Sequence, residues 1–268
     1  MHSGYEGYRR SMSPQRRTTP PVFVRLAADP VRWRLLEELA DSDLRVRELV
    51  SRVGRPQNLV SYHLRVLREG GLVSATRSSS DGRDSYYHLH LDRCAEALAD
   101  SGAALHPMLR AEPPIASAQG GRLHRVAVLF VCTGNSARSA IAEALLRHRT
   151  GGLVAVASAG TRPRPSLHPD TVRVLREQFG IDVAGRPTRH LDDLAGRAFD
   201  HVITLCDKAR EVCPDIPGTS RRVHWSIPDP ATADDGYPAF ARIAAEIDAR
   251  IGHLLPVLAL THRQEAQP

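Results

Sequence analysis

The chain contains no apolar run long enough to cross a membrane and no N-terminal signal peptide, so we expect a cytoplasmic protein without a membrane partner. Cysteine is scarce, with four in 268 residues. In a reducing compartment a pair of cysteines is more typical of catalysis than of a structural disulfide. The net charge of +6 is divided between both halves of the chain, so it does not indicate a single face for nucleic acid.

Three of these cysteines occupy positions that suit redox chemistry. Cys132 directly follows the strand-like residues 126–131, Cys206 follows a second such stretch at residues 201–205, and Cys213 lies seven residues further along. A thiol at an anion-binding loop with two more thiols close together is typical of a nucleophile and a disulfide relay. If residues 206–213 are helical, their ends lie about 10 Å apart. A disulfide spans roughly 7 Å between Cα atoms, so this segment must then partly unwind to oxidise.

The residues after Cys132 have the composition of an oxyanion-binding loop, with Thr133, Gly134, Asn135, Ser136 and Ala137 between the cysteine and Arg138. A strand, a tight loop and a helix N-terminus present several N–H groups to one anion, and the same field favours a cysteine thiolate. Gly134 and Asn135 best tolerate the unusual backbone angles of such a loop. Arg138 offers a planar fork to two oxyanion oxygens, and Ser139 can donate to the thiolate. The alternative is a buried cysteine before an ordinary helix.

Residues 128–139, followed by Ala142 and Glu143, closely resemble the low-molecular-weight tyrosine phosphatase superfamily, and within it the thioredoxin-coupled arsenate reductases. The resemblance covers roughly residues 125–258. It includes residues 157–160, the segment around the two later cysteines, and His224-Trp225 ahead of Pro228-Asp229-Pro230.

The resemblance implies a catalytic role for six residues: Cys132, Arg138, Ser139, Cys206, Cys213 and Asp229. Cys132 attacks arsenate, Asp229 protonates the departing oxygen, Cys206 attacks the resulting adduct and Cys213 closes the final disulfide. An external thiol reductant, either thioredoxin or a small thiol with a redoxin, then completes turnover, and no tightly bound cofactor or metal is expected. Asn135, Glu143 and Ser158 match three positions of a potassium site found in some of these reductases, whereas the fourth aligns poorly, near Arg189.

A protein tyrosine phosphatase is the rival enzyme, because phosphate and arsenate are near-isosteres and a phosphatase needs only Cys132, Arg138 and Asp229. The reductase is favoured by the presence of Cys206 and Cys213. Residues 231–235 after the Asp-Pro motif also lack the aromatic side chains with which these phosphatases grip a phenyl ring.

The N-terminal third predicts a different module. Amphipathic helices at residues 31–39, 46–50 and 57–70 precede two strands at 72–77 and 85–91 that form a hairpin, or wing. This is a winged helix-turn-helix arrangement, whose third helix enters the major groove of DNA. The candidate DNA contacts are Gln57, Asn58, Ser61, Tyr62, His63 and Arg65 on that helix, with Arg77 and Arg83 on the wing. A small helical protein-interaction domain is the alternative.

Residues 27–36 and 59–73 resemble the arsenical-repressor (ArsR-type) winged-helix family, which implies operator DNA as partner and a homodimer through this domain. The family's arsenite sensors carry a Cys-x-Cys before the recognition helix, but here Arg45 and Arg47 occupy those places. Direct arsenite sensing at that site is therefore not expected. Cys94 is interpreted as structural or incidental.

Segment composition divides the chain into a tail at 1–20, a winged-helix domain at 21–105, a Pro- and Gly-containing linker at 106–121, an enzyme domain at 122–260 and a tail at 261–268. In the enzyme domain, strand-like segments at 125–131, 153–157 and 200–205 alternate with helical ones at 138–149, 168–179 and 238–255. This pattern predicts an α/β three-layer domain with a parallel sheet. We therefore predict an arsenate reductase fused to a DNA-binding regulator of arsenic resistance. The alternative outside enzymology is a repressor that senses oxyanion or redox state without turnover.

Overall fold

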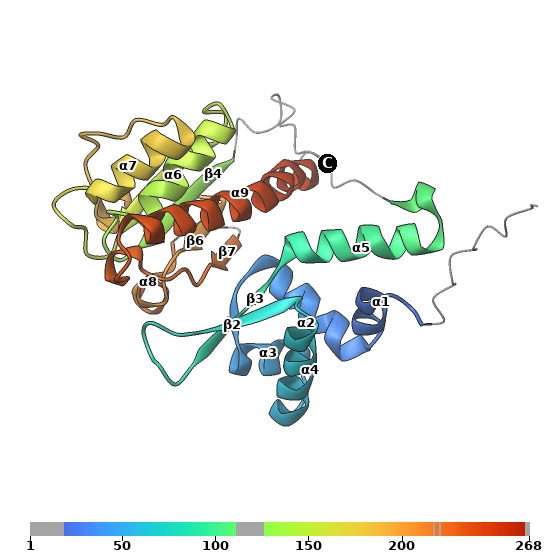
Figure 1. The fold of residues 1–268 in the computed structure, drawn as a ribbon. Helices are drawn as coiled ribbons and strands as arrows, with labels where there is room; N and C mark the ends of the chain where they lie inside the picture. Colours follow the sequence, from blue (N-terminus) through green and yellow to red (C-terminus); the bar gives the residue numbers. More distant parts are fainter. Residues whose placement is uncertain (1–18, 111–125, 217, 220, 266–268) are drawn as a thin grey trace, which may run out of the picture.

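The computed structural model describes residues 19–110, 126–216, 218–219 and 221–265, so the first 18 residues and most of the predicted linker lie outside it. The described residues form a three-stranded and a four-stranded sheet, and each sheet packs against its own cluster of buried apolar side chains. Figure 1 shows the two halves that these clusters stabilise. The predicted combination of a winged-helix domain and an α/β domain with a parallel sheet is confirmed.

The N-terminal half consists of α1 (Val22–Ala27), α2 (Pro30–Asp41), β1 (Leu44–Arg45), α3 (Val46–Val53), α4 (Gln57–Glu69), β2 (Val73–Arg77), β3 (Ser85–Leu89), α5 (Leu91–Leu105) and η1 (Pro107–Leu109). The side chain of Asp29 starts α2 by accepting the N–H groups of Val31 and Arg32. Gly54, at φ 64°, ends α3 in the left-handed conformation. The antiparallel pair β2–β3 is the predicted wing.

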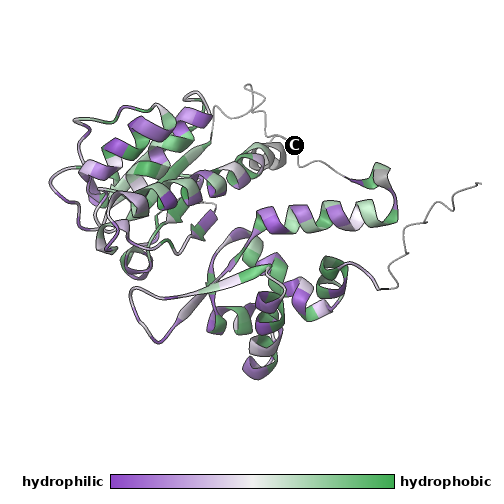
Figure 2. Ribbon diagram, in the orientation of Figure 1, coloured by the Kyte–Doolittle hydropathy of each residue, from purple (hydrophilic) through white to green (hydrophobic). Residues whose placement is uncertain are grey.

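The C-terminal half consists of β4 (Ala127–Cys132), α6 (Arg138–Arg149), β5 (Ala155–Gly160), α7 (Pro169–Phe179), η2 (Leu191–Leu194), β6 (His201–Thr204), α8 (Asp207–Val212), β7 (Arg221–His224), η3 (Pro230–Thr232) and α9 (Tyr237–Glu265). All its strand pairs are parallel. Figure 2 shows that β4 is hydrophobic along its length, as expected for a strand buried on both faces. The sequence did not predict β7, and α9 continues past the predicted boundary at 260.

Strand order places the carboxyl end of β4 at a functional position. β5 follows β4 in the chain and pairs on one side of it, whereas β6 pairs on its other side. The crevice between β4 and β6 is therefore a topological switch point, where α/β sheets bind ligands. Cys132 ends β4 and Cys206 lies two residues after β6, so both thiols belong to this crevice. Within the described residues, no helix is long and apolar enough to cross a membrane.

Candidate active site

The loop between β4 and α6 is held from outside through its carbonyl groups. Carbonyls of Cys132, Thr133, Gly134 and Ser136 accept backbone N–H groups of Thr161, Arg162, Arg164 and His168, respectively. Within the described part of the chain, the N–H groups of Thr133, Gly134, Ser136 and Ala137 donate to no protein group. These N–H groups precede the N-terminus of α6, whose dipole adds positive potential. The loop therefore offers an anion a set of free donors.

Asn135 shapes the inside of this loop. With φ 48°, it is the one non-glycine residue at positive φ among the described residues, whereas Gly134 does not adopt positive φ and the sequence argument overstated its role. The Asn135 backbone N–H donates to Cys132 Sγ at 3.2 Å. Its side-chain amide donates to Ser139 Oγ and Ser158 Oγ, both at 2.9 Å, and its Oδ1 accepts the N–H of Arg189. These bonds stabilise a backbone conformation that is unfavourable for most residues.

Ser139 is oriented toward the nucleophile. Its Oγ lies 3.0 Å from Cys132 Sγ, as the sequence argument predicted. Because this oxygen already accepts a hydrogen bond from Asn135, its own hydrogen can be donated, either to the sulfur at 3.0 Å or to the Ala159 carbonyl at 3.5 Å. Two donors, the Asn135 N–H and the Ser139 hydroxyl, can therefore stabilise a thiolate at Cys132.

Arg138 and Asp229 face each other across the loop. The Arg138 Nη2 donates to Asp229 Oδ2 at 2.7 Å and its Nη1 to the carbonyl of Ile227 at 3.1 Å. The Arg138 side chain is buried, and its Nε has no hydrogen-bond partner within the described structure. A buried guanidinium donor left unpaired beside free backbone N–H groups indicates a site for an oxyanion. Asp229 is 39 % exposed, so it can reach a substrate oxygen from the solvent side.

The two later cysteines flank α8. Cys206, at the N-terminal end of α8, has its Sγ 3.3 Å from Thr133 Oγ1 at the loop. Burial raises the pKa of the Cys206 thiol, and the positive charge of Arg138 only partly opposes this. Cys213 lies at the C-terminal end of α8, and burial raises its pKa too. Both are free thiols. The structure thus brings Cys132, Arg138, Ser139, Asp229 and Cys206 together, whereas Cys213 is a helix length away.

A cluster around Glu143 lies beside the loop. Its Oε2 accepts the Ser158 hydroxyl at 2.6 Å, which connects it to Asn135. Its Oε1 accepts hydrogen bonds from Nη2 of Arg147 at 2.6 Å and from Nη2 of Arg186 at 2.8 Å. Asn135, Glu143 and Ser158 were predicted from the family resemblance, whereas Arg186 was not, because no local pattern shows a residue 43 positions from its partner. The carboxylate thus already has two cationic partners.

Gly160 allows β5 to approach the loop. A Cβ at this position would lie 2.7 Å from the Thr133 carbonyl oxygen and 3.0 Å from the Asn135 nitrogen. We predict that Gly160→Ala displaces the loop and lowers kcat/KM by about 10²-fold, since small misplacements of reacting groups have effects of that size. The matched control is Gly252→Ala in α9, where a Cβ meets nothing within 4 Å. Wild-type kinetics for Gly160→Ala would contradict this account of the loop.

The predicted DNA contacts are exposed with one exception. On α4, Gln57, Asn58, Ser61, Tyr62 and Arg65 are exposed, as are Arg77 and Arg83 on the wing. His63 is only 6 % exposed, so its assignment as an outward base contact was wrong. It shares the inward face of α4 with Val60, Leu64 and Leu67. That spacing of three and four residues is the ordinary helical periodicity, and it could have identified the burial of His63.

Comparisons with known proteins support the predicted family of each half. The model of the family described as low molecular weight phosphotyrosine protein phosphatase matches residues 127–265, and that of the bacterial regulatory protein, arsR family, matches residues 29–75. An arsenate reductase of Brevibacillus brevis is 40 % identical over 125 residues, which are 46 % of this chain and 90 % of the relative. One of Halalkalibacterium halodurans is 35 % identical over 133 residues, 48 % of this chain and 94 % of the relative.

Solved structures also match the C-terminal half. A crystal structure of an arsenate reductase from Archaeoglobus fulgidus is 31 % identical, covers 48 % of this chain and 98 % of its own, and superposes with a TM-score of 0.41.

Proposed function

We propose that this chain, which belongs to the low molecular weight phosphotyrosine protein phosphatase family through residues 127–265 and carries an arsR-family domain at residues 29–75, is an arsenate reductase fused to a DNA-binding regulator. The observation that carries the reductase over the phosphatase is the position of Cys206. Its thiol lies 3.3 Å from Thr133 Oγ1 of the anion-binding loop, where a phosphatase needs no second thiol. The relatives named as arsenate reductases agree with this choice.

The first step uses the loop. The free N–H groups and Arg138 bind arsenate, which displaces the Asp229 carboxylate from Arg138. The displaced Asp229 takes up a proton from solvent. The Cys132 thiolate then attacks arsenic, and Asp229 gives this proton to an arsenic-bound hydroxyl, which leaves as water. The product is a covalent Cys132–arsenic adduct in which arsenic is still As(V).

The second step reduces arsenic. Cys206 attacks the Cys132 sulfur, a sulfur–sulfur bond forms, and the sulfur–arsenic electron pair stays on arsenic, which leaves as arsenite. Cys213 then attacks Cys206, which frees Cys132 and leaves the Cys206–Cys213 disulfide. Each arsenate therefore consumes two thiols and gives one arsenite, one disulfide and one water. An external dithiol, thioredoxin or a small-thiol redoxin system, reduces the disulfide.

The same geometry predicts the pH dependence of the second step. Because burial raises the pKa of Cys206 and of Cys213 above their ordinary values, both thiols are mostly protonated at neutral pH. The thiolate fraction grows about tenfold per pH unit below the pKa. The single-turnover rate of arsenite release should therefore rise by about tenfold per unit from pH 7 to pH 8, as measured by rapid quench. A rate that falls over this range would contradict the assignment of Cys206 as attacking thiol.

In this proposal the Arg186 guanidinium takes the place of potassium. It pairs with Glu143, which otherwise would be the carboxylate of the cation site. Turnover at constant ionic strength should therefore be equal in potassium and sodium salts. In Arg186→Ala, potassium should stimulate turnover more than sodium does, because the carboxylate has lost one of its two cationic partners. Stimulation of the wild-type chain by potassium but not by sodium would refute this role.

The N-terminal half supplies the surface that we propose binds operator DNA. Its exposed α4 side chains and wing arginines suit operator DNA. Leu98 and Leu105, which are seven residues apart and therefore on one side of α5, are both exposed, and a homodimer would cover that side. We therefore propose that α5 pairs two copies. Sedimentation of the whole chain at micromolar concentration tests this, and a monomer would contradict it.

The test of the enzyme is arsenate-dependent oxidation of NADPH by the purified chain with thioredoxin and thioredoxin reductase. Multiple turnovers that require arsenate support the reductase. Hydrolysis of an aryl phosphate without arsenate-dependent oxidation would mean that the chain is a phosphatase, and absence of both reactions would mean a sensor without turnover.

A further inference from the structure

The helix between the two relay cysteines, α8, also contacts the DNA-binding half. Three of the six residues of α8 contact that half. Asp207 Oδ2 accepts two hydrogen bonds from Ser79 in the wing loop, from the backbone N–H at 2.6 Å and from Oγ at 3.0 Å. Figure 1 shows the wing loop extending toward α8. The wing is thus fixed to the enzyme through the residue that follows Cys206.

Two further residues of α8, Arg210 and Glu211, contact the segment from Asp43 to Glu48 at the start of α3. Arg210 donates from Nη2 to Glu48 at 2.5 Å and from Nη1 to the carbonyl of Asp43 at 3.3 Å. Glu211 Oε1 accepts Nη1 of Arg45 at 2.8 Å. The guanidinium groups of Arg45 and Arg210 lie 5.4 and 5.1 Å from the centre of the buried Tyr86 ring. Arg45 occupies one of the places of the sensor thiols, and here it contacts the enzyme instead.

These contacts require α8 to be helical. Cys206 is the N-cap and Cys213 the C-cap of α8, so an intact helix keeps their Cα atoms about 10 Å apart. A disulfide needs them within roughly 7 Å. Forming the Cys206–Cys213 bond must therefore unwind at least part of α8, and the side chains of Asp207, Arg210 and Glu211 cannot all keep their present positions.

We propose that the Cys206–Cys213 disulfide is the inducing signal of the DNA-binding half: its formation unwinds α8, breaks the contacts to the wing and to α3, and releases operator DNA. The proposal rests on the proposed function, because arsenate supplies the oxidant. Arsenic accepts two electrons, the two thiols lose two electrons and two protons, and the external dithiol reverses the change. The regulator thus detects arsenate through the enzyme's own turnover rather than through a metal-binding thiol pair.

We expect the reduced state to bind DNA more tightly than the oxidised state, because only the reduced state holds the wing loop in place. In the reduced state, Gln57, Asn58 and Arg65 of α4 are exposed while Asp207 holds the wing loop in place. The reading helix and the wing are then fixed relative to each other before DNA arrives, which favours binding. Oxidation releases the wing and the start of α3 together. DNA binding to the oxidised chain then carries the added entropic cost of ordering both segments, and its affinity is lower.

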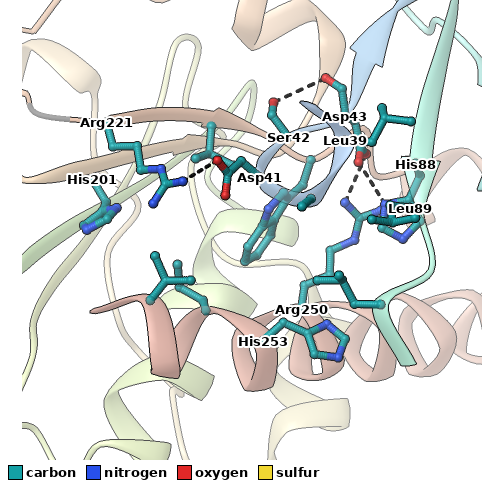
Figure 3. Close-up of a pocket in the computed structure, with 16 residues that line it drawn as sticks. Leu39, Asp41, Ser42, Asp43, His88, Leu89, His201, Arg221, Arg250 and His253 are labelled. Carbon is teal, nitrogen blue, oxygen red and sulfur yellow. Dashed lines mark hydrogen bonds and ion pairs between the residues drawn. The ribbon is translucent and has the colours of Figure 1, made fainter. Parts of the chain in front are cut away.

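A second set of contacts keeps the halves attached while α8 changes. Figure 3 shows Asp43 beside Arg250 of α9 and His88 of the wing. The Asp43 carboxylate accepts hydrogen bonds from Nη1 of Arg250 at 3.0 Å and from the N–H of Ser226 at 2.7 Å. Neither of these partners belongs to α8. The contacts of the Asp43 carboxylate therefore act as a fixed joint between the halves, and the α8 contacts, which include Arg210 at the Asp43 carbonyl, are the part that the redox state controls.

The test compares DNA affinity of the whole chain in two redox states. The probe is a duplex selected from a random-sequence pool by the chain reduced with dithiothreitol. Affinity is measured by fluorescence anisotropy before and after one equivalent of arsenate without reductant. We expect the dissociation constant to rise about tenfold, within the usual range of coupling between sites, and to recover on adding dithiothreitol. Equal affinities in the two states, or tighter binding after oxidation, would overturn the proposal.

Two variants separate the switch from the enzyme. In Cys213→Ser, arsenate chemistry stops at the Cys132–Cys206 disulfide, so α8 stays helical and DNA affinity should not change; a loss equal to wild type would overturn the role of α8. In Cys132→Ser, arsenate does nothing, but diamide joins Cys206 to Cys213 directly and should weaken DNA binding about tenfold. Cys94 should not interfere, because burial raises its pKa to about 11.

The diamide result distinguishes the two failures. If oxidised Cys132→Ser loses DNA affinity while arsenate has no effect on the wild-type chain, the switch stands and the proposed reductase fails. If diamide forms the disulfide, verified by peptide mapping, and affinity is unchanged, the switch is refuted whatever the enzyme does. Glu211→Ala should weaken DNA binding of the reduced chain severalfold with unchanged arsenate turnover, since it removes the acceptor of the Arg45 contact alone.

Discussion

Cys206→Ser is expected to abolish arsenate-dependent turnover, lowering kcat by about 10⁴-fold or more, as removal of an attacking group does in other enzymes. The adduct on Cys132 can still form, because the loop, Arg138 and Asp229 are unchanged. Arsenic cannot then be reduced by this chain, since a hydroxyl oxygen does not replace the thiolate as attacking atom. NADPH consumption with thioredoxin and its reductase measures the effect.

The control for this variant is Cys94→Ala, which removes the one cysteine outside the enzyme half and should keep wild-type kcat. Calorimetry with arsenate checks that Cys206→Ser still binds the oxyanion. Arsenate turnover by Cys206→Ser at a rate near that of the wild-type chain would show that Cys206 is not in the relay.

Asp43→Ala is expected to destabilise the chain by about 3–5 kcal/mol, the range for removing one partner of a buried ion pair. Asp43 is 2 % exposed and Arg250 is 8 % exposed. Without the carboxylate, the guanidinium of Arg250 remains buried with only Glu246 as its charged partner. The Ser226 N–H also loses its acceptor. Urea unfolding followed by circular dichroism measures the change in the free energy of unfolding.

Acid should not mimic this substitution until the pH is very low. Burial alone would raise the pKa of Asp43, but Arg250 and His88 hold it well below its ordinary value. A lowered pKa in the folded state means that the stability is present above the unfolded pKa and is lost as the pH falls through the folded one. The contribution of Asp43 is therefore complete above about pH 5, begins to decline in the range where an unfolded aspartate is protonated, and is fully lost only well below that range.

Asp41→Ala is the matched control. Asp41 pairs with Arg221 across the same junction but is 54 % exposed, and exposed pairs contribute about 0–1 kcal/mol. If Asp43→Ala and Asp41→Ala destabilise the chain equally, Asp43 is not the fixed joint between the halves.

Local chemistry made much of the site predictable. Cys132 and Arg138 belong to a segment whose residue types are constrained by anion binding, whereas Asp229 was predicted through the family resemblance; the structure places all three around one loop. The helices α2 and α4 were predictable because their apolar residues repeat at helical spacing. Asn135 was predictable as a left-handed residue, since few residue types tolerate that conformation.

The contacts between the halves could not be predicted from local patterns. Asp43 and Arg250 are 207 residues apart, and neither lies in a motif that implies a partner. Arg45 was notable in the sequence only as the absence of a thiol, whereas the structure shows it paired with Glu211. Such pairs depend on how two folded surfaces meet, and no spacing within one segment reports that.

The most direct test of the relay is to map the disulfides that form after one equivalent of arsenate, in the absence of reductant. The account predicts Cys206–Cys213 in the wild-type chain and a trapped Cys132–Cys206 bond in Cys213→Ser, each with one arsenite released. Cys132 joined to no other cysteine in the variant, with arsenite still formed, would contradict the three-cysteine relay.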